Sequence, residues 1–132
     1  MVLGGEAIVE ALELLEAGAL VPEKQDDALS CHAKLITKEM GNIDFEKSAN
    51  EINRLVRGLN PWPSAYTDWN GKVMKIWDAS VEEGVSSEVP GTVVKVEKEA
   101  FYVQTGEGFL KVNELQIPGK KRMDAGAFMR GY

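Results

Sequence analysis

The stretch AYTDWNGKVMKIWDAS, residues 65–80, decides the fold that we predict for this chain. Asn70-Gly71 separates two runs that are rich in β-branched and aromatic residues. Asn-Gly in such a position is the strongest short-range signal of a β-hairpin. The hairpin would join strands at residues 65–69 and 72–80. We therefore expect a β-sheet to begin here and to fill the C-terminal part of the chain.

Three more runs with β-strand character follow the hairpin, at residues 92–96, 100–105 and 109–117. Five short strands in about fifty residues are too few for an immunoglobulin-type sandwich. They match a small closed or partly open barrel of the oligonucleotide-binding (OB) type. Asp124 is expected to cap a short closing helix.

A first helix is predicted over residues 5–20, upstream of the strands. Ile8, Leu12 and Leu15 recur at helical spacing, and glutamates occupy the opposite side of the helix. The polar residues 23–30 then suit an exposed linker, and residues 31–40 are expected to be partly helical.

A second helix is predicted after caps at Asn42 and Asp44, and it ends at Asn60-Pro61. The fold class that follows is mainly β with flanking helices. It consists of a small five-stranded OB-like barrel preceded by two helices and a linker.

Charge is unevenly distributed along the 132 residues. The 15 basic and 21 acidic side chains give a net charge of −6, and residues 1–53 hold 11 of the acidic ones. An acidic total argues against a general nucleic-acid binder, which needs clustered Lys and Arg, but it leaves room for a local basic patch.

Cysteine and histidine are too scarce for two kinds of site. Cys31 and His32 are the only residues of their types, so neither an internal disulfide nor a Cys/His zinc site is possible. No apolar run approaches the length of a membrane span, and the start lacks the basic region of a signal peptide. We therefore expect a cytoplasmic protein without membrane contact.

Nothing in the sequence resembles an active site by its own chemistry. His32 has no nucleophile or orienting carboxylate beside it in a recognisable motif. Gly4-Gly5 and Gly106-Glu107-Gly108 lack the spacing of a phosphate-binding loop and are interpreted as turn glycines.

Aromatic residues admit two readings, base stacking on a barrel face or core packing, and core packing is favoured. Trp62, which lies between two prolines, is interpreted as a buried hinge. The aromatic residues considered for stacking are Trp62, Tyr66, Trp69, Trp77, Phe101 and Tyr102.

One tight basic cluster, Lys120-Lys121-Arg122, follows the Pro-Gly turn after the last predicted strand. Phosphate contact and a solvated tail are equally good readings of it. Lys34 and Lys38 would share one helical face if their segment is helical, and Arg54 and Arg57 share a face of the second helix.

Two segments resemble methionyl-tRNA formyltransferase. RGLNPWPSAYT at residues 57–67 is similar to a signature of that family, and ELQIPGKKRM at 114–123 is a second match. A looser third match runs through Ala33-Lys34-Leu35, Lys38-Glu39 and Ile43-Asp44-Phe45. The matches are colinear over nearly the whole chain.

The resemblance implies an enzyme that transfers a formyl group from 10-formyltetrahydrofolate to the methionine amino group of initiator tRNA. It also implies truncation, because the family's catalytic asparagine, histidine and aspartate and its folate pocket lie in an upstream Rossmann-like domain. His32 does not match the catalytic histidine. The chain alone is therefore expected to be inactive and to bind no cofactor.

The same resemblance implies three parts. Residues 1–20 would be the last helix of the missing formyltransferase domain, 21–42 a linker, and 43–132 a C-terminal OB-like domain that binds tRNA. The first helix would lack its usual cover, so it is expected to self-associate or to be poorly ordered. The residues expected to bind tRNA are Lys34, Lys38, Arg54, Arg57, Lys120, Lys121 and Arg122.

Two alternatives remain open. Other folate-dependent formyltransferases, including those that act on nucleotide sugars, share a related C-terminal domain, although the basic segment at 114–123 suits a polyanionic substrate better. The chain would otherwise work as an independent barrel module on structured RNA.

Overall fold

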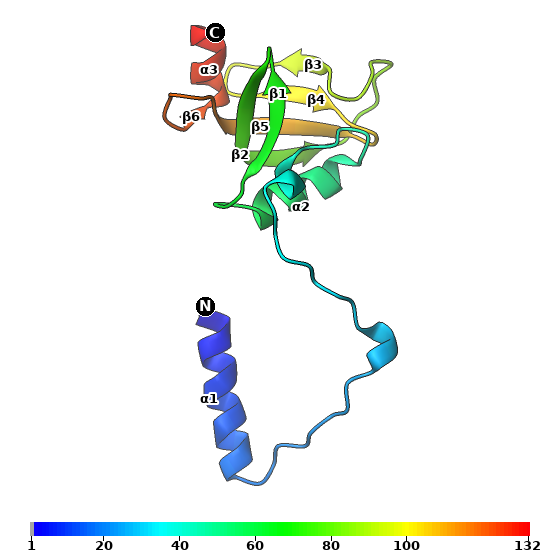
Figure 1. The fold of residues 1–132 in the computed structure, drawn as a ribbon, viewed down its shortest axis with the longest axis vertical. Helices are drawn as coiled ribbons and strands as arrows, with labels where there is room; N and C mark the ends of the chain where they lie inside the picture. Colours follow the sequence, from blue (N-terminus) through cyan, green and yellow to red (C-terminus); the bar gives the residue numbers. More distant parts are fainter. Residues whose placement is uncertain (1) are drawn as a thin grey trace. The chain divides into compact units, whose positions relative to one another are not determined.

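The computed structural model describes residues 2–132, which divide into two compact units, residues 2–34 and 35–132. Figure 1 shows the fold of each unit. The first unit contains helix α1 (Val2–Glu16) and a short 3-10 helix, η1 (Asp27–Leu29). No residue of α1 is buried. The predicted first helix is confirmed, but it ends at Glu16, before Gly18 turns the backbone into the left-handed region with φ of 66°.

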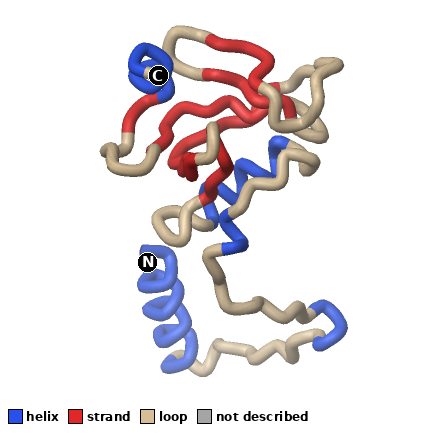
Figure 2. The backbone as a smooth tube through the Cα atoms, turned by 45° about the horizontal axis from the view of Figure 1, so that its top comes forward, coloured by secondary structure: helices blue, strands red, loops and turns tan. Residues whose placement is uncertain are grey.

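The second unit is an antiparallel sheet with two α-helices. Its strands pair in the order β1-β2-β5-β4-β3, and β6 pairs with the end of β5. Figure 2 shows these strands as the red part of the tube, with the helices in blue. The elements are η2 (Glu39–Gly41), α2 (Ala49–Gly58), β1 (Ala65–Trp69), β2 (Lys72–Glu82), β3 (Val93–Val96), β4 (Phe101–Gln104), β5 (Phe109–Gln116), β6 (Met123–Asp124) and α3 (Ala125–Gly131).

The five predicted strands are confirmed, and the sheet differs from the expectation in two respects. A sixth, two-residue strand, β6, follows the basic loop. The sheet is also open, because no ladder within residues 2–132 joins the edge strands β1 and β3. Aromatic side chains, among them Trp69 and Phe101, line a cavity of about 210 Å³ that both edge strands border. The predicted OB-like barrel is therefore an open sheet, whose edge strands do not pair with each other.

The core lies between the sheet and α2. Leu110, Val112 and Leu115 of β5 are fully buried, and α2 packs against β2 and β5 through Ile52 and Val56. At 25 cal/mol per Å² of apolar surface, burial of one such side chain contributes about 1.5–3 kcal/mol. Leu110 and Val112 follow the alternation of a strand, and a register irregularity against β2 places Leu115 three residues further on, so the opposite face of the sheet is left for polar side chains.

Helix α2 begins later than predicted. Ser48 is its N-cap, in place of Asn42 or Asp44. The backbone N–H of Glu51 donates to Ser48 Oγ (3.3 Å), and the backbone N–H of Ser48 donates to Glu51 Oε2 (3.1 Å). This reciprocal capping box satisfies two N–H groups that would otherwise lack partners, whereas the side chain of Asp44 accepts only the N–H of Glu46.

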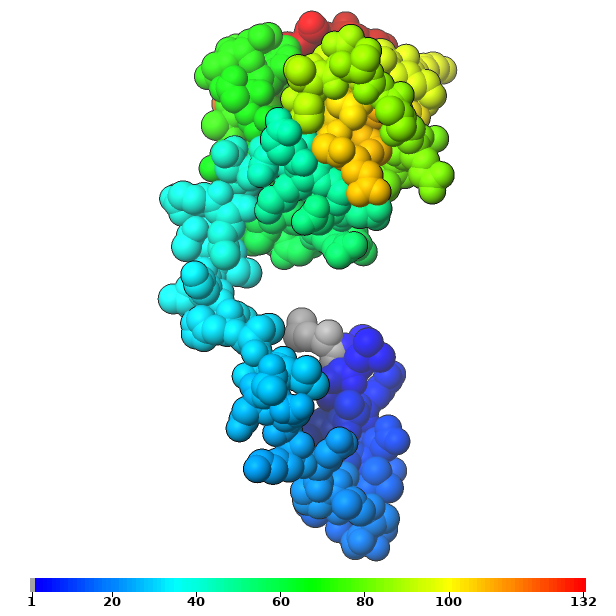
Figure 3. Space-filling view, turned by 90° about the vertical axis from the view of Figure 1, so that its right-hand side faces the viewer, coloured from blue at the N-terminus to red at the C-terminus, as the bar shows by residue number. Residues whose placement is uncertain are grey.

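The turn between β4 and β5 holds the approach to α2. Gly106 N–H donates to the carbonyls of Phe45 and Lys47, both at 2.9 Å, and Ala49 N–H donates to the carbonyl of Glu107 at 2.9 Å. In Figure 3 the yellow-orange surface of this turn adjoins the blue-green surface of the α2 region. A Cβ atom at position 106 would collide with the carbonyl of Glu46. The turn prediction is confirmed for Gly106 and Gly108, and Gly106 is required by a close approach of two backbone segments. It is wrong for Gly4 and Gly5, which lie within helix α1.

We expect Gly106→Ala to lower the free energy of unfolding by about 1–3 kcal/mol, the usual cost of overpacking. Urea unfolding followed by circular dichroism measures the change. Gly58→Ala is the matched control, because nothing lies within 4 Å of a Cβ atom there. Equal stability of the two variants would contradict the assigned role of the turn.

The capping box also predicts a dependence on pH. Hydrogen bonds from the Ser48 side chain and then the Ser48 backbone lower the pKa of Glu51 below its ordinary value. A lowered folded-state pKa stabilises the protein above the unfolded-state pKa, about 4.3 for Glu, and this contribution is lost as pH falls through the folded-state value. Wild type should therefore exceed Glu51→Gln in stability at pH 7, with the difference shrinking below about pH 4. Glu88→Gln is the control, since the Glu88 carboxylate makes no hydrogen bond within residues 2–132.

Candidate nucleic-acid interface

The predicted basic cluster lies in the loop between β5 and β6. Lys120, Lys121 and Arg122 are all exposed, and Gly119 turns the loop with φ of 74°. The N–H of Lys120 donates to the carbonyl of Ile117 at 3.2 Å, which closes the turn. Ordinary turn chemistry thus presents three cations together on the surface.

Arg122 has two partners that its sequence neighbours do not indicate. Its Nη2 pairs with Oε2 of Glu114, and its guanidinium carbon lies 5.2 Å from the centroid of the Trp77 ring. Lys75 Nζ lies 6.0 Å from the same ring. Both cations are within the range of a cation–π interaction. We call Lys75, Trp77, Glu114, Gln116 and Arg122 the Trp77 cluster.

Hydrogen bonds fix the Trp77 ring and connect it to the basic loop. The indole N–H donates to Gln116 Oε1 at 3.2 Å, and Gln116 Nε2 donates to the carbonyl of Lys120 at 2.9 Å. Asn60 Nδ2 donates to the carbonyl of Trp77 at 3.1 Å. A groove of about 310 Å³ beside the cluster is lined by Val73, Lys75, Gln116, Ile117, Pro118 and Gly119.

A second group, Lys95, Glu97, Tyr102 and Lys111, lies across β3, β4 and β5; we call it the Tyr102 cluster. The Nζ atoms of Lys95 and Lys111 lie 4.6 Å and 5.5 Å from the Tyr102 ring centroid. Lys95 Nζ is 2.6 Å from Glu97 Oε1, and the Tyr102 hydroxyl donates to Glu97 Oε2 at 2.8 Å. Tyr102 is consequently only 2% exposed.

The Tyr102 cluster stays charged around neutral pH. The hydrogen bond with Glu97 raises the pKa of Lys95, and the hydrogen bond with Tyr102 raises the pKa of Lys111. The hydrogen bond from Lys95 lowers the pKa of Glu97. Within the cluster two lysines face one carboxylate, and the charge of Glu82 also acts on both lysines.

Both clusters face away from the core. Lys111 pairs with Tyr102, and Lys75 pairs with Gln116, while Leu110, Val112 and Leu115 point inward. Lys111 and Gln116 are five residues apart on β5, so the clusters are separated by about 16 Å. Lys75, Lys95 and Lys111 were not predicted as site residues. For Lys75 and Lys111, alternation with inward-facing apolar residues was the available signal. Lys95 had no such signal, because β3 contains no buried residue.

The remaining predicted cations do not join these clusters. Lys34 is in the first unit and Lys38 in the second, and neither lies within a helix, because η1 ends at Leu29 and η2 begins at Glu39. The condition for a shared helical face of Lys34 and Lys38 is therefore not met, because residues 30–38 form no helix. Arg54 and Arg57 do lie on α2, where both are exposed.

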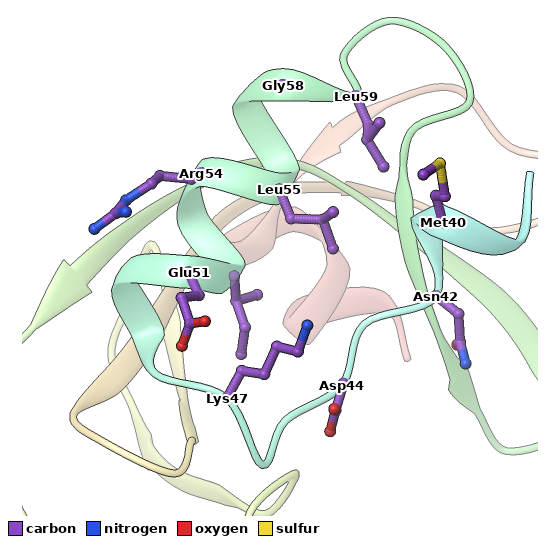
Figure 4. A pocket seen from close by; sticks show the side chains of 10 residues that line it. Met40, Asn42, Asp44, Lys47, Glu51, Arg54, Leu55, Gly58 and Leu59 are labelled. Atoms are coloured by element: carbon purple, nitrogen blue, oxygen red, sulfur yellow. The ribbon is translucent and has the colours of Figure 1, made fainter. Parts of the chain in front are cut away.

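Arg54 borders a cavity of about 480 Å³ along α2, shown in Figure 4. Leu55 and Leu59 point toward Met40 across this cavity, whereas Arg54 points away from it. Lys47 is balanced by Asp44 and Glu51 around the same cavity. The mixed charges give this cavity no strong preference for an anion.

The aromatic residues divide between core and surface. Trp69 packs edge to face on Phe128 with centroids 5.0 Å apart, and Phe101 is buried. Trp62 is 58% exposed, so its interpretation as a buried hinge is wrong. The neighbouring Pro63 and Ser64 are buried instead, and they anchor the loop from which Trp62 projects.

Other chemistry is sparse. Cys31 is a free, exposed thiol. No group of three or more His, Cys, Asp or Glu side chains within residues 2–132 is placed to hold a metal ion. No helix in that described range is both long enough and apolar enough to cross a membrane.

Comparisons with known proteins agree with one another. The family model described as "Formyl transferase, C-terminal domain" matches residues 35–132. Proteins named methionyl-tRNA formyltransferase are 52% identical in Lachnospira eligens, 47% in Agathobacter rectalis and 44% in Clostridium novyi, over 97–99% of this chain. The chain spans 41–42% of the length of these relatives.

The solved structures support the fold alone. A crystal structure of HypX from Aquifex aeolicus is 24% identical, with a TM-score of 0.62, over 96% of this chain and 23% of HypX. HypX in complex with tetrahydrofolic acid gives a TM-score of 0.61.

The exposed position of Trp62 predicts a small effect of its removal. We expect Trp62→Ala to change the free energy of unfolding by less than about 0.5 kcal/mol, as is usual for surface positions. Trp69→Ala, which removes the packing on Phe128, should cost about 2–4 kcal/mol. Thermal unfolding of both variants checks this, and a large destabilisation by Trp62→Ala would restore the hinge interpretation.

Proposed function

Because this chain belongs to the formyl transferase family through the C-terminal domain at residues 35–132, we propose that it serves methionyl-tRNA formyltransferase as the part that binds and positions tRNA. The whole enzyme would transfer a formyl group from 10-formyltetrahydrofolate to the methionine amino group of initiator Met-tRNA. The observation that carries this proposal is the 44–52% identity over 97–99% of the chain to proteins of that name.

The transfer needs a nucleophilic amine, a bound formyl donor and a group that accepts a proton. The described residues do not fit the folate donor. The cavity beside β1 and β3 is apolar and has only about 210 Å³, and the cavity along α2 has a rim of opposite charges. We therefore assign folate binding and catalysis to the part of the relatives that this chain does not match, and we expect the chain alone to be inactive.

The proposed contribution of this chain is positioning. Holding a large substrate in a fixed place removes translational and rotational freedom before reaction, which accounts for a large part of many rate enhancements. Phosphate contacts provide such positioning without reading base sequence. The Trp77 cluster and the adjoining Lys120 and Lys121 are the surface that we propose for these contacts.

The proposal also includes the other residues predicted to bind tRNA and the predicted division of the chain into three parts. Lys34, Lys38, Arg54 and Arg57 are exposed cations that we propose as further tRNA contacts. We retain residues 1–20 as the last helix of an upstream formyltransferase domain, 21–42 as linker and 43–132 as the tRNA-binding domain. The exposed apolar side chains Ile8, Leu12 and Leu15 support packing of α1 on that domain, or self-association in its absence. A cytoplasmic location fits translation initiation.

The proposal predicts salt-dependent binding of initiator tRNA. We expect affinity to fall steeply with salt. When Lys120, Lys121 and Arg122 are all changed to Glu, the log–log slope should flatten by roughly one unit for each phosphate that no longer meets a cation. Filter binding or fluorescence anisotropy across a salt series measures both slopes. Changing Lys24, Lys72 and Lys98 to Glu is the matched control, since it alters net charge equally at exposed positions elsewhere.

Two results would contradict the proposal. Equally weakened binding by the two triple variants would show that net charge alone governs affinity. Negligible, salt-independent binding by the wild type would assign tRNA affinity to another part of the enzyme.

A further inference from the structure

We propose that Glu114 occupies the phosphate-binding position of Arg122 in the free protein, and that a phosphate of the RNA backbone replaces it on binding. This inference rests on the proposed function and identifies which group in the Trp77 cluster changes partner. Glu114 would then lower the affinity for tRNA. A ligand would need several closely spaced negative charges to displace it from Arg122.

The geometry of Arg122 supports this exchange. A carboxylate and a phosphate both present oxygens that a guanidinium binds through its fork of N–H groups. Glu114 takes one arm of that fork in the structure, through a single contact between its Oε2 and Nη2 of Arg122. The side chains of Arg122 and Glu114 are 47% and 38% exposed, so a ligand phosphate can reach the pair from solvent.

Trp77 keeps Arg122 in place whichever anion is bound. The guanidinium lies over an indole ring whose N–H is held by Gln116, and this stacking does not depend on Glu114. Gln116 also binds the carbonyl of Lys120, so the same side chain orients both the ring and the basic loop. Exchange of Glu114 for a phosphate therefore needs no rearrangement of the loop.

The surroundings favour a polyanion over Glu114. An exposed ion pair between two side chains is weak in water. A chain of phosphates can bind Lys120 and Lys121 together with Arg122, whereas a single phosphate meets competition from Glu114 at that position. Glu97 in the Tyr102 cluster differs, because it is held by Lys95 and by the Tyr102 hydroxyl together.

The test compares Glu114→Gln with Glu88→Gln in the full 132-residue chain. Both variants remove one negative charge, and a glutamine at 114 retains an oxygen that accepts a hydrogen bond from Arg122. We expect Glu114→Gln to bind initiator tRNA about two- to fivefold more tightly than wild type, with a steeper salt dependence, and Glu88→Gln to behave as wild type. The indole N–H signal of Trp77 in NMR spectra reports whether the cluster is intact in each variant.

A double-mutant cycle separates pairing from general charge. In an Arg122→Gln background the increase in affinity from Glu114→Gln should vanish, because the guanidinium that Glu114 occupies is gone. An increase that persists there, or a Glu114→Gln protein that binds no more tightly than Glu88→Gln, overturns the inference while leaving the proposed function intact. Salt-independent, negligible binding by the wild type fails the proposed function and this inference together.

Discussion

The pairing of β2 with β5 is the interaction on which the rest of the second unit depends. It places Ile76 opposite Leu115 and Ala79 opposite Val112, so these two strands supply the centre of the core. The register shifts between Ile76 and Ala79 let the strands keep apolar residues inward at both ends. Because a slip of one residue would turn every side chain to the opposite face, the same pairing fixes which cations reach the surface.

The positions of the charged side chains matter more for anion binding in this protein than its net charge does. The second unit, residues 35–132, carries 13 basic and 14 acidic side chains and is therefore nearly neutral. Its surface still offers a basic loop and two clusters in which lysine or arginine lies over an aromatic ring. A net charge of −6 would have excluded a nucleic-acid interface only if charge were spread evenly.

Local signals predicted much of the fold. Asn70-Gly71 marked the hairpin, helical spacing marked α2, and Pro118-Gly119 marked the turn that presents the basic loop. The start of α2 was missed because Asn42, Asp44 and Ser48 are all good caps, and only Ser48 has its reciprocal partner in place. Where several residues could cap a helix equally well, tertiary contacts decide which one does. Here the deciding contacts are the backbone hydrogen bonds to the turn after β4.

Only the part of the candidate site that is contiguous in sequence was predictable. Lys120, Lys121 and Arg122 are adjacent in sequence and were visible as a cluster. Trp77 is 45 residues from Arg122, and their contact depends on strand register, which single-sequence patterns do not reveal. Trp62 was misplaced because two flanking prolines indicate a constrained backbone without indicating which side chain faces solvent.

The open sheet has a consequence for the protein in concentrated solution. Unpaired strand edges are templates for edge-to-edge aggregation. Here β1 and β3 have only five and four residues, and β3 carries Lys95. Segment 42–43 also covers part of β1, where Ile43 N–H donates to the carbonyl of Tyr66 at 2.8 Å. Short length, an edge lysine and a covering segment together protect an unclosed sheet against polymerisation.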